Sequence, residues 1–127
     1  IRGASVYTLS EEASDNEAAA LAARENRADV LGGIDLTEET DEVSSILIDL
    51  AQRETMNSSA RYANLLVAKM AEQTYVLRNS HRFAGFAVLK GPDIPAVLVE
   101  LGYLSNKADA ELLATKKGRA KLVKALV

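Results

Sequence analysis

The chain has 127 residues, of which 48% are hydrophobic, and it carries a formal net charge of −3. This length suits one compact domain with a single apolar core. The absence of cysteine excludes disulfides and thiolate chemistry, and no apolar run reaches the roughly 18 residues that a membrane span needs. Because the sequence begins with Ile1 rather than methionine, we expect it to be a piece of a longer protein.

The first elements in chain order are a strand and a helix. Residues 3–9 (GASVYTL) form a short run that contains β-branched and aromatic side chains, which predicts a strand. Residues 14–31 predict a helix, because Ser14 and Glu17 have the spacing of a capping box and the glycine pair at 32–33 is a typical helix stop.

The middle of the chain predicts a long helical stretch followed by two strands. Apolar residues recur at helical spacing through residues 43–73, although the polar sequence RETMNSS at 53–59 would kink or divide such a helix. Two apolar runs of strand length, 83–90 (FAGFAVLK) and 96–101 (AVLVEL), are separated by the turn sequence GPDIP.

The last part of the chain, from residue 106 to residue 127, predicts a helix that Gly118 would interrupt. A cluster of basic side chains in this stretch has helical spacing, and a nucleic-acid patch is one interpretation of it. Because aromatic residues for base stacking are few, we favour a solvated helix face and expect no nucleic-acid partner. The basic residues are Lys116, Lys117, Arg119, Lys121 and Lys124.

The predicted order of elements is strand, helix, helix, helix, strand, strand, helix. Continuous apolar strands that helices cover are typical of α/β proteins, in which the sheet is buried on both faces. We therefore expect a layered α/β/α domain with a mostly parallel central sheet. No internal repeat or low-complexity segment is visible.

Glu100 is the first candidate for a functional residue. It stands in the apolar sequence VLVELGY, at the end of a predicted strand. Burying a lone carboxylate is unfavourable unless it is paired, hydrogen-bonded or bound to a metal. Strand ends are also where open α/β sheets place ligand-facing groups, so Glu100 is either a general base or a surface-facing residue.

Glu25 is the second candidate, because it falls within an apolar stripe of the helix predicted at 14–31. A carboxylate in such a stripe needs a cation, and Arg24, Arg27, a residue of a facing element or a metal ion would supply one. A salt bridge to one of the two neighbouring arginines is the simplest of these interpretations.

His81 is the only histidine of the chain. A zinc hydrolase site typically has three protein ligands, mostly histidines, and an open position for water. The residues of this chain alone therefore do not provide a complete metal site, and there is no glycine-rich phosphate loop. We expect His81 to be a surface or loop residue.

One predicted helix is apolar on two sides. Ile48 lies on a different side of this helix from its main apolar stripe. Such a helix is either buried or offers its second face to a partner, and burial is the default interpretation. The main stripe consists of Val43, Ile46, Leu47 and Leu50.

Five segments of the chain carry a family resemblance. The string PDIPAVLVELGYLSNKADAELL, residues 92–113, closely resembles the C-terminal signature of zinc-dependent N-acetylmuramoyl-L-alanine amidases, the periplasmic cell-division amidases of Gram-negative bacteria. The segments RGASVYTLSEEAS, ARENRADVLGG, ILIDLAQRET and FAVLKGPDIP resemble further blocks of that family, in the same order. The resemblance therefore covers essentially the whole chain.

This resemblance implies a peptidoglycan hydrolase. The family cleaves the amide bond between N-acetylmuramic acid and the L-alanine of the stem peptide, with a zinc ion that polarises the carbonyl and activates water. By motif, Glu100 corresponds to the general base of the family. The resemblance also implies a periplasmic enzyme that acts in cell-wall remodelling and daughter-cell separation.

The resemblance further implies regulation by an autoinhibitory helix. By the motif REN, Glu25 corresponds to the residue of that helix that ligates the zinc ion and blocks the site. A following helix of the family binds an activator protein of the degenerate LytM type. The corresponding stretch here contains Ile46, Leu47 and Leu50, which we expect to bind the activator.

The three core zinc ligands of the family, two histidines and a glutamate, precede the part that this chain resembles. We therefore expect a partial amidase catalytic domain over residues 1–127, truncated at its N-terminal side. It would contain an inserted regulatory helical segment at about 14–56 and the C-terminal core strands and helix at 83–127. Whether the chain alone binds zinc stays open, and the alternative function is a catalytically inactive regulatory and activator-docking module.

Overall fold

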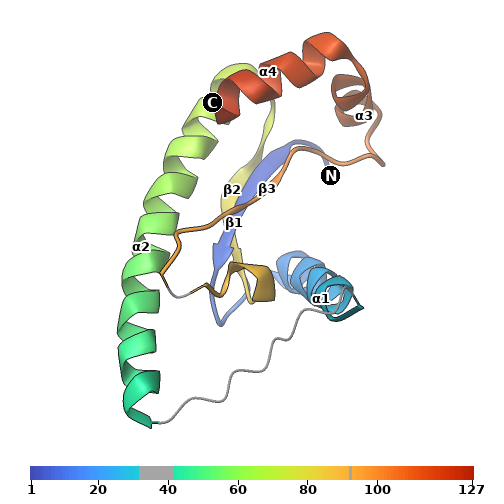
Figure 1. Cartoon of the computed structure of the whole chain (residues 1–127). Coiled ribbons are helices and arrows are strands. Elements are labelled where there is room, and N and C mark those ends of the chain that lie inside the picture. The colour runs from blue at the N-terminus through green and yellow to red at the C-terminus, as the bar shows by residue number, and fades with distance from the viewer. Residues whose placement is uncertain (32–41, 92) are drawn as a thin grey trace.

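The computed structural model describes residues 1–31, 42–91 and 93–127. These residues form one small sheet with helices around it (Figure 1). The strands are β1 (Ala4–Leu9), β2 (Val76–Ala84) and β3 (Leu98–Glu100). The helices are α1 (Asn16–Leu31), α2 (Glu42–Gln73), α3 (Lys107–Ala114) and α4 (Lys116–Leu126), together with the short 3-10 helix η1 (Ala87–Leu89).

The strands form a mixed sheet in the order β2–β1–β3. β1 runs parallel to β2, with Tyr7 opposite Arg82, and antiparallel to β3, with Ser5 opposite Glu100. The expected α/β class is therefore confirmed. We expected a mostly parallel sheet, and the described strands contain one pairing of each kind. Because of this register, Glu100 lies beside the first residues of β1.

Helices cover both faces of the sheet, which gives the expected layered arrangement (Figure 1). On one face, Val6 packs against Leu66 of α2 and Ala125 of α4. On the opposite face, Tyr7 packs against Ala22 of α1. Successive side chains of a strand point to opposite faces, which is why Val6 and Tyr7 belong to separate core clusters.

The prediction for β2 was wrong. We expected a strand at residues 83–90, but β2 ends at Ala84, and η1 forms within the apolar run. The strand instead takes the more polar sequence before this run, because pairing with the buried β1 outweighs a weak local pattern. The expectation of a surface or loop position for His81 was also wrong, since Nε2 of this β2 residue lies 2.8 Å from Thr8 Oγ1 and Nδ1 lies 3.1 Å from Asn64 Oδ1.

α2 is one continuous helix, although we expected the polar stretch at 53–59 to kink or divide it. Within this stretch, the Ser59 hydroxyl donates to the Thr55 carbonyl at 2.9 Å and accepts from the Ala96 N–H at 3.0 Å. Ser59 therefore makes hydrogen bonds inside α2 and to the segment before β3, and the helix continues.

The start of α1 differs from the predicted capping box. The helix begins at Asn16, and Asp15 Oδ1 accepts from the Ala18 N–H at 2.8 Å, so Asp15 is the N-cap. Ser14 pairs with β2 instead. Its N–H donates to the Phe83 carbonyl at 2.9 Å, and its hydroxyl accepts from the Phe83 N–H at 2.6 Å.

The last helical stretch is divided at Thr115 rather than at Gly118. The Thr115 hydroxyl accepts from the Gly118 N–H at 3.0 Å and so caps α4. Gly118 lies directly against the Leu112 carbonyl, which shows that glycine is needed where α4 meets α3. The basic residues of this stretch are all exposed, as expected for a solvated helix face.

Gly118→Ala is expected to lower the free energy of unfolding of the full-length protein by about 2 kcal/mol, because the added methyl group would collide with the Leu112 carbonyl. Chemical denaturation measures the loss. Gly91→Ala is the matched control, since a Cβ at that position would meet Ile94 at an ordinary 3.9 Å. Equal stability of the two variants would contradict the close contact between α3 and α4.

Candidate active site

Glu100 is the last residue of β3, and its side chain faces α1. Leu98, two residues earlier, packs in the core cluster beneath α1, whereas Val99 packs on the α2 side. Because side chains alternate along a strand, Glu100 shares the α1 face with Leu98. Its strand partner Ser5 is buried, and Glu100 itself is half-buried. The carboxylate is thus half-buried on the face of the sheet that α1 packs against.

The structure places Glu25 near enough to Glu100 for the two charges to interact. Glu25 is half-buried on α1. The pKa of the Glu100 carboxyl is raised above its ordinary value, first by burial and second by the negative charge of Glu25, while Arg24 opposes the rise. A carboxylate with a raised pKa is a stronger base, and it is better matched to proton transfer near neutral pH.

Glu25 forms no ion pair with any residue that the structure describes. The salt bridge to Arg24 or Arg27, which was the simplest interpretation of the sequence, is therefore not formed. The charge of Glu25 instead interacts unfavourably with that of Glu100, because two neighbouring carboxylates repel each other when both are ionised. This leaves the oxygen atoms of Glu25 available to a cation.

The described residues do not complete a metal site by themselves. Within residues 1–31, 42–91 and 93–127, no group of three or more potential ligands is arranged to hold a metal ion. A catalytic zinc site uses three protein ligands, so Glu25 and Glu100 would contribute at most part of one. His81 does not join them, because it contacts Asn64 of α2 on the other side of the sheet.

A buried arginine fixes the start of α1, and the sequence analysis did not single it out. Arg82 is 4% exposed and lies on β2 opposite Tyr7. Its Nη2 donates to both carboxylate oxygens of Asp15 at 2.6 Å, and its Nη1 donates to the Tyr7 hydroxyl at 2.9 Å. Glu17 Oε2 lies 3.5 Å from the same guanidinium. Arg82 stands just before the strand expected at residues 83–90 and outside every predicted element, so nothing in the sequence indicated this role.

The groups around Arg82 are held in defined protonation states. The hydrogen bond from Arg82 lowers the pKa of Asp15, and burial raises the pKa of Tyr7. Burial, followed by the neighbouring Tyr7 and Glu17, raises the pKa of Tyr103 to about 12. The Tyr103 hydroxyl therefore stays protonated and donates to Glu17 Oε1 at 3.2 Å, which adds a second connection to the first turn of α1.

Arg82→Met is expected to lower the free energy of unfolding of the full-length protein by about 2 kcal/mol at neutral pH, because Asp15 and Tyr7 lose a charged donor. The difference from the parent protein should shrink with acid. Since the pKa of Asp15 is lowered in the fold, its pairing stabilises the protein above the unfolded-state pKa of about 3.9 and is lost as Asp15 becomes protonated.

Denaturation at neutral pH and at about pH 3 measures both effects, the lower value being below the ordinary pKa of aspartate. Arg78→Met is the matched control, because Arg78 lies on the same strand with an exposed side chain. A loss of stability that is equal at the two pH values would contradict the pairing of Arg82 with Asp15.

A second buried residue, Asp109, holds the segment that follows β3. Its Oδ2 accepts from the Gly3 N–H at 2.7 Å and from the Tyr103 N–H at 3.0 Å. Gly102 has a φ of 155°, and a Cβ at that position would press against the Asp109 side chain. Asn106 is the N-cap of α3. The sequence LGYLSNKAD is therefore a rigid support for the end of the strand that carries the candidate base.

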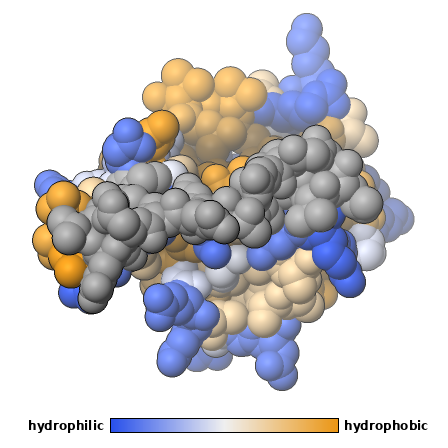
Figure 2. Space-filling view, turned by 60° about the horizontal axis from the view of Figure 1, so that its bottom comes forward, coloured by the Kyte–Doolittle hydropathy of each residue, from blue (hydrophilic) through white to orange (hydrophobic). Residues whose placement is uncertain are grey.

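The candidate activator-binding residues lie at the surface. Ile46, Leu47 and Leu50 are 58%, 63% and 59% exposed, so the default interpretation of burial is wrong for them. Figure 2 turns the end of the molecule where α2 begins toward the reader, and hydrophobic residues lie at the surface there among hydrophilic ones. Exposed apolar residues on one helix are typical of a protein-binding surface.

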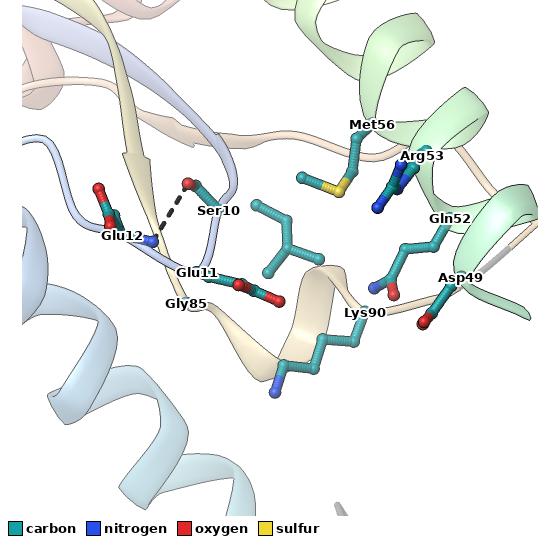
Figure 3. Close-up of a pocket in the computed structure, with 10 residues that line it drawn as sticks. Ser10, Glu11, Glu12, Asp49, Gln52, Arg53, Met56, Gly85 and Lys90 are labelled. Carbon is teal, nitrogen blue, oxygen red and sulfur yellow. Dashed lines mark hydrogen bonds between the residues drawn. The ribbon is translucent and has the colours of Figure 1, made fainter. Parts of the chain in front are cut away.

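A cavity of about 830 Å³ lies between the end of β1 and the first half of α2 (Figure 3). Glu11 lines it on the β1 side, Gln52 on the α2 side, and Lys90 after η1. Neither Glu25 nor Glu100 lines this cavity. Since Glu100 pairs with the beginning of β1, the cavity is separate from the candidate active site.

The fold and the site together define an α/β protein with a half-buried general-base candidate on the sheet face that α1 packs against. The family model described as N-acetylmuramoyl-L-alanine amidase matches residues 1–127, and the chain belongs to this family. No helix in the described part of the chain is both long and apolar enough to cross a membrane.

Curated relatives match the chain over much of its length. The N-acetylmuramoyl-L-alanine amidase AmiA of Escherichia coli (strain K12) is 34% identical over 98% of this chain and 43% of that protein. The N-acetylmuramoyl-L-alanine amidase AmiC of Neisseria meningitidis serogroup B is 33% identical over 93% of this chain and 28% of that protein. The chain therefore spans less than half the length of these relatives.

Proposed function

We propose that the full-length protein is a peptidoglycan hydrolase that cleaves the amide bond between N-acetylmuramic acid and the L-alanine of the stem peptide. Family membership and the amidases among the relatives support this proposal. The structural observation that carries it is the position of Glu100, which is half-buried at a strand end, has a raised pKa and forms no ion pair with the described residues.

In this proposal Glu100 is the general base. Its carboxylate accepts a proton from water while the water oxygen adds to the amide carbonyl carbon, and the proton passes to the leaving nitrogen as the C–N bond breaks. The products are the muramic acid carboxyl group and a peptide with a free amino terminus. A zinc ion would supply Lewis-acid polarisation of the carbonyl. In the inhibited state, Glu25 is the residue of this chain that would bind the ion, together with ligands from outside the described residues, and it would leave the ion before catalysis.

We further propose that α1 is an autoinhibitory helix. It covers the face of the sheet to which Glu100 points, so substrate reaches the base only after the helix moves. The exposed residues Ile46, Leu47 and Leu50 would bind an activator of the LytM type. The proposed setting is the periplasm, where the enzyme would act in cell-wall remodelling and daughter-cell separation.

The test is hydrolysis of a defined muropeptide by the full-length protein, with the products identified by mass spectrometry. Release of the intact stem peptide with a free amino group on its L-alanine would support the proposal. Cleavage within the peptide or the glycan would contradict it, as would the absence of cleavage by a folded, zinc-supplemented Glu25→Ala variant.

A further inference from the structure

We propose that Asn26 is the latch of α1, the residue whose side-chain amide holds the second half of the helix in place and keeps Glu25 beside Glu100. The start of the helix, which Arg82 and Ser14 hold, is the point about which α1 moves when the latch opens. This inference rests on the proposed function, because a latch controls activity only if α1 blocks the site.

Asn26 makes two hydrogen bonds with the backbone that joins β2 to η1. Its Nδ2 donates to the Gly85 carbonyl at 2.9 Å, and its Oδ1 accepts from the Ala87 N–H at 2.8 Å. One side-chain amide thus pairs with a backbone carbonyl and with a backbone N–H two residues further on. A neighbouring β-strand would pair with the same two groups. Because Asn26 directly follows Glu25, these bonds also determine where Glu25 lies.

The other described contacts in this half of α1 are weak. The buried α1 side chains that the structure describes, Ala18 and Ala22, lie in the first half of the helix, and none of the side chains of residues 24–28 is buried. Glu25 adds repulsion, because its negative charge lies near that of Glu100. Among the described side chains of this half, residues 24–28, the two bonds of Asn26 are therefore the main attachment to the rest of the fold.

The start of α1 is attached more firmly. Arg82 donates to both carboxylate oxygens of Asp15, and hydrogen bonds between charged groups are roughly twice as strong as neutral ones. Ser14 adds two further hydrogen bonds with the backbone of Phe83. Loss of the Asn26 bonds would therefore free one end of α1 while the other end stays on the sheet.

Asn26→Asp tests the latch, because aspartate keeps the shape of the side chain but has no donor for the Gly85 carbonyl. Amide hydrogen exchange of the full-length protein, without activator or substrate, is read by mass spectrometry. Peptides from α1 should exchange roughly tenfold faster, as expected when one hydrogen bond is lost and a carboxylate oxygen faces the Gly85 carbonyl. Exchange in residues 60–70 of α2 should not change. Asn57→Asp, on the exposed surface of α2, is the control for the added charge.

Asn26→Ala is the second variant, because it removes both hydrogen bonds without adding a charge. It should accelerate exchange in α1 in the same way. Unchanged exchange of α1 in both variants would overturn the proposal. Acceleration of the same size in residues 60–70 would also overturn it, since Asn26 would then stabilise the whole fold rather than one end of a helix.

Basal hydrolysis of a muropeptide separates the latch from the proposed function. Faster α1 exchange together with roughly tenfold higher hydrolysis in the Asn26 variants would support both proposals. Higher hydrolysis in Glu25→Ala alone, with unchanged α1 exchange in the Asn26 variants, would overturn the latch and leave the autoinhibition in place. Faster α1 exchange with no rise in hydrolysis in any of these variants would support the latch as the attachment of α1 but overturn its control of activity.

Discussion

Glu100→Gln is expected to lower the turnover of a muropeptide by the full-length protein at least about 100-fold, which is within the range typical for loss of a general base. Glutamine keeps the size of the side chain and most of its hydrogen bonding, but it cannot accept the proton from water. Burial and Glu25 disfavour the charged form of Glu100, so the neutral amide should not reduce the stability of the fold at neutral pH.

The combination of a large loss of rate with unchanged or increased stability distinguishes catalysis from damage to the fold. Turnover is measured from the released peptide, and stability from thermal denaturation of the same samples. Glu111→Gln is the matched control, because Glu111 is an exposed glutamate shortly after Glu100 in the sequence. Near-parental turnover in a folded Glu100→Gln protein would rule out this residue as the base.

Glu25→Ala is expected to raise hydrolysis in the absence of activator by roughly tenfold or more. A helix that must leave before substrate binds makes the closed molecules inactive, so the apparent activity falls with the fraction of closed molecules. Weakening the closed state lowers this fraction and raises the activity. The substitution also removes the repulsion between Glu25 and Glu100, and its effect on activity therefore has to be compared with its effect on stability.

A second substitution separates regulation from destabilisation. Leu50→Asp, or Ile46→Asp, should abolish stimulation by the activator but leave a Glu25→Ala protein active. Leu65→Asp is the matched control, since Leu65 lies on the same helix and is 59% exposed, the same fraction as Leu50. Loss of activity in every background would indicate unfolding. A folded, zinc-loaded Glu25→Ala protein with parental basal activity would contradict autoinhibition by this residue.

The elements with strong local patterns were predicted well from the sequence. β1 and α1 differ from their predicted bounds by only one or two residues, because a short β-branched run and a glycine pair mark their limits. β2 could not be predicted in this way. Its sequence, VLRNSHRFA, becomes a strand through pairing with β1, and that pairing joins residues far apart in the chain.

The candidate site was predictable where a residue contradicts its surroundings. Glu100 and Glu25 are carboxylates in apolar patterns, and in the structure the charge of Glu25 raises the pKa of Glu100. Arg82 and Asn26 carry no such signal, because their partners Asp15 and Gly85 are 67 and 59 positions away in the sequence. The motif REN identified Glu25 as a candidate from the sequence. The contacts of Asn26, the next residue, are visible only in the structure.

The bond between Asp109 and Gly3 has a consequence for the order in which the site forms during synthesis. It connects residues 106 positions apart, and contacts of such separation form late because a long loop must close first. The same carboxylate holds Tyr103, just after β3. On a ribosome, β3 therefore lacks this support until the residues of α3 have emerged. A nascent chain at that stage carries Glu100 without this support, and the end of β3 becomes organised only after α3 has been synthesised.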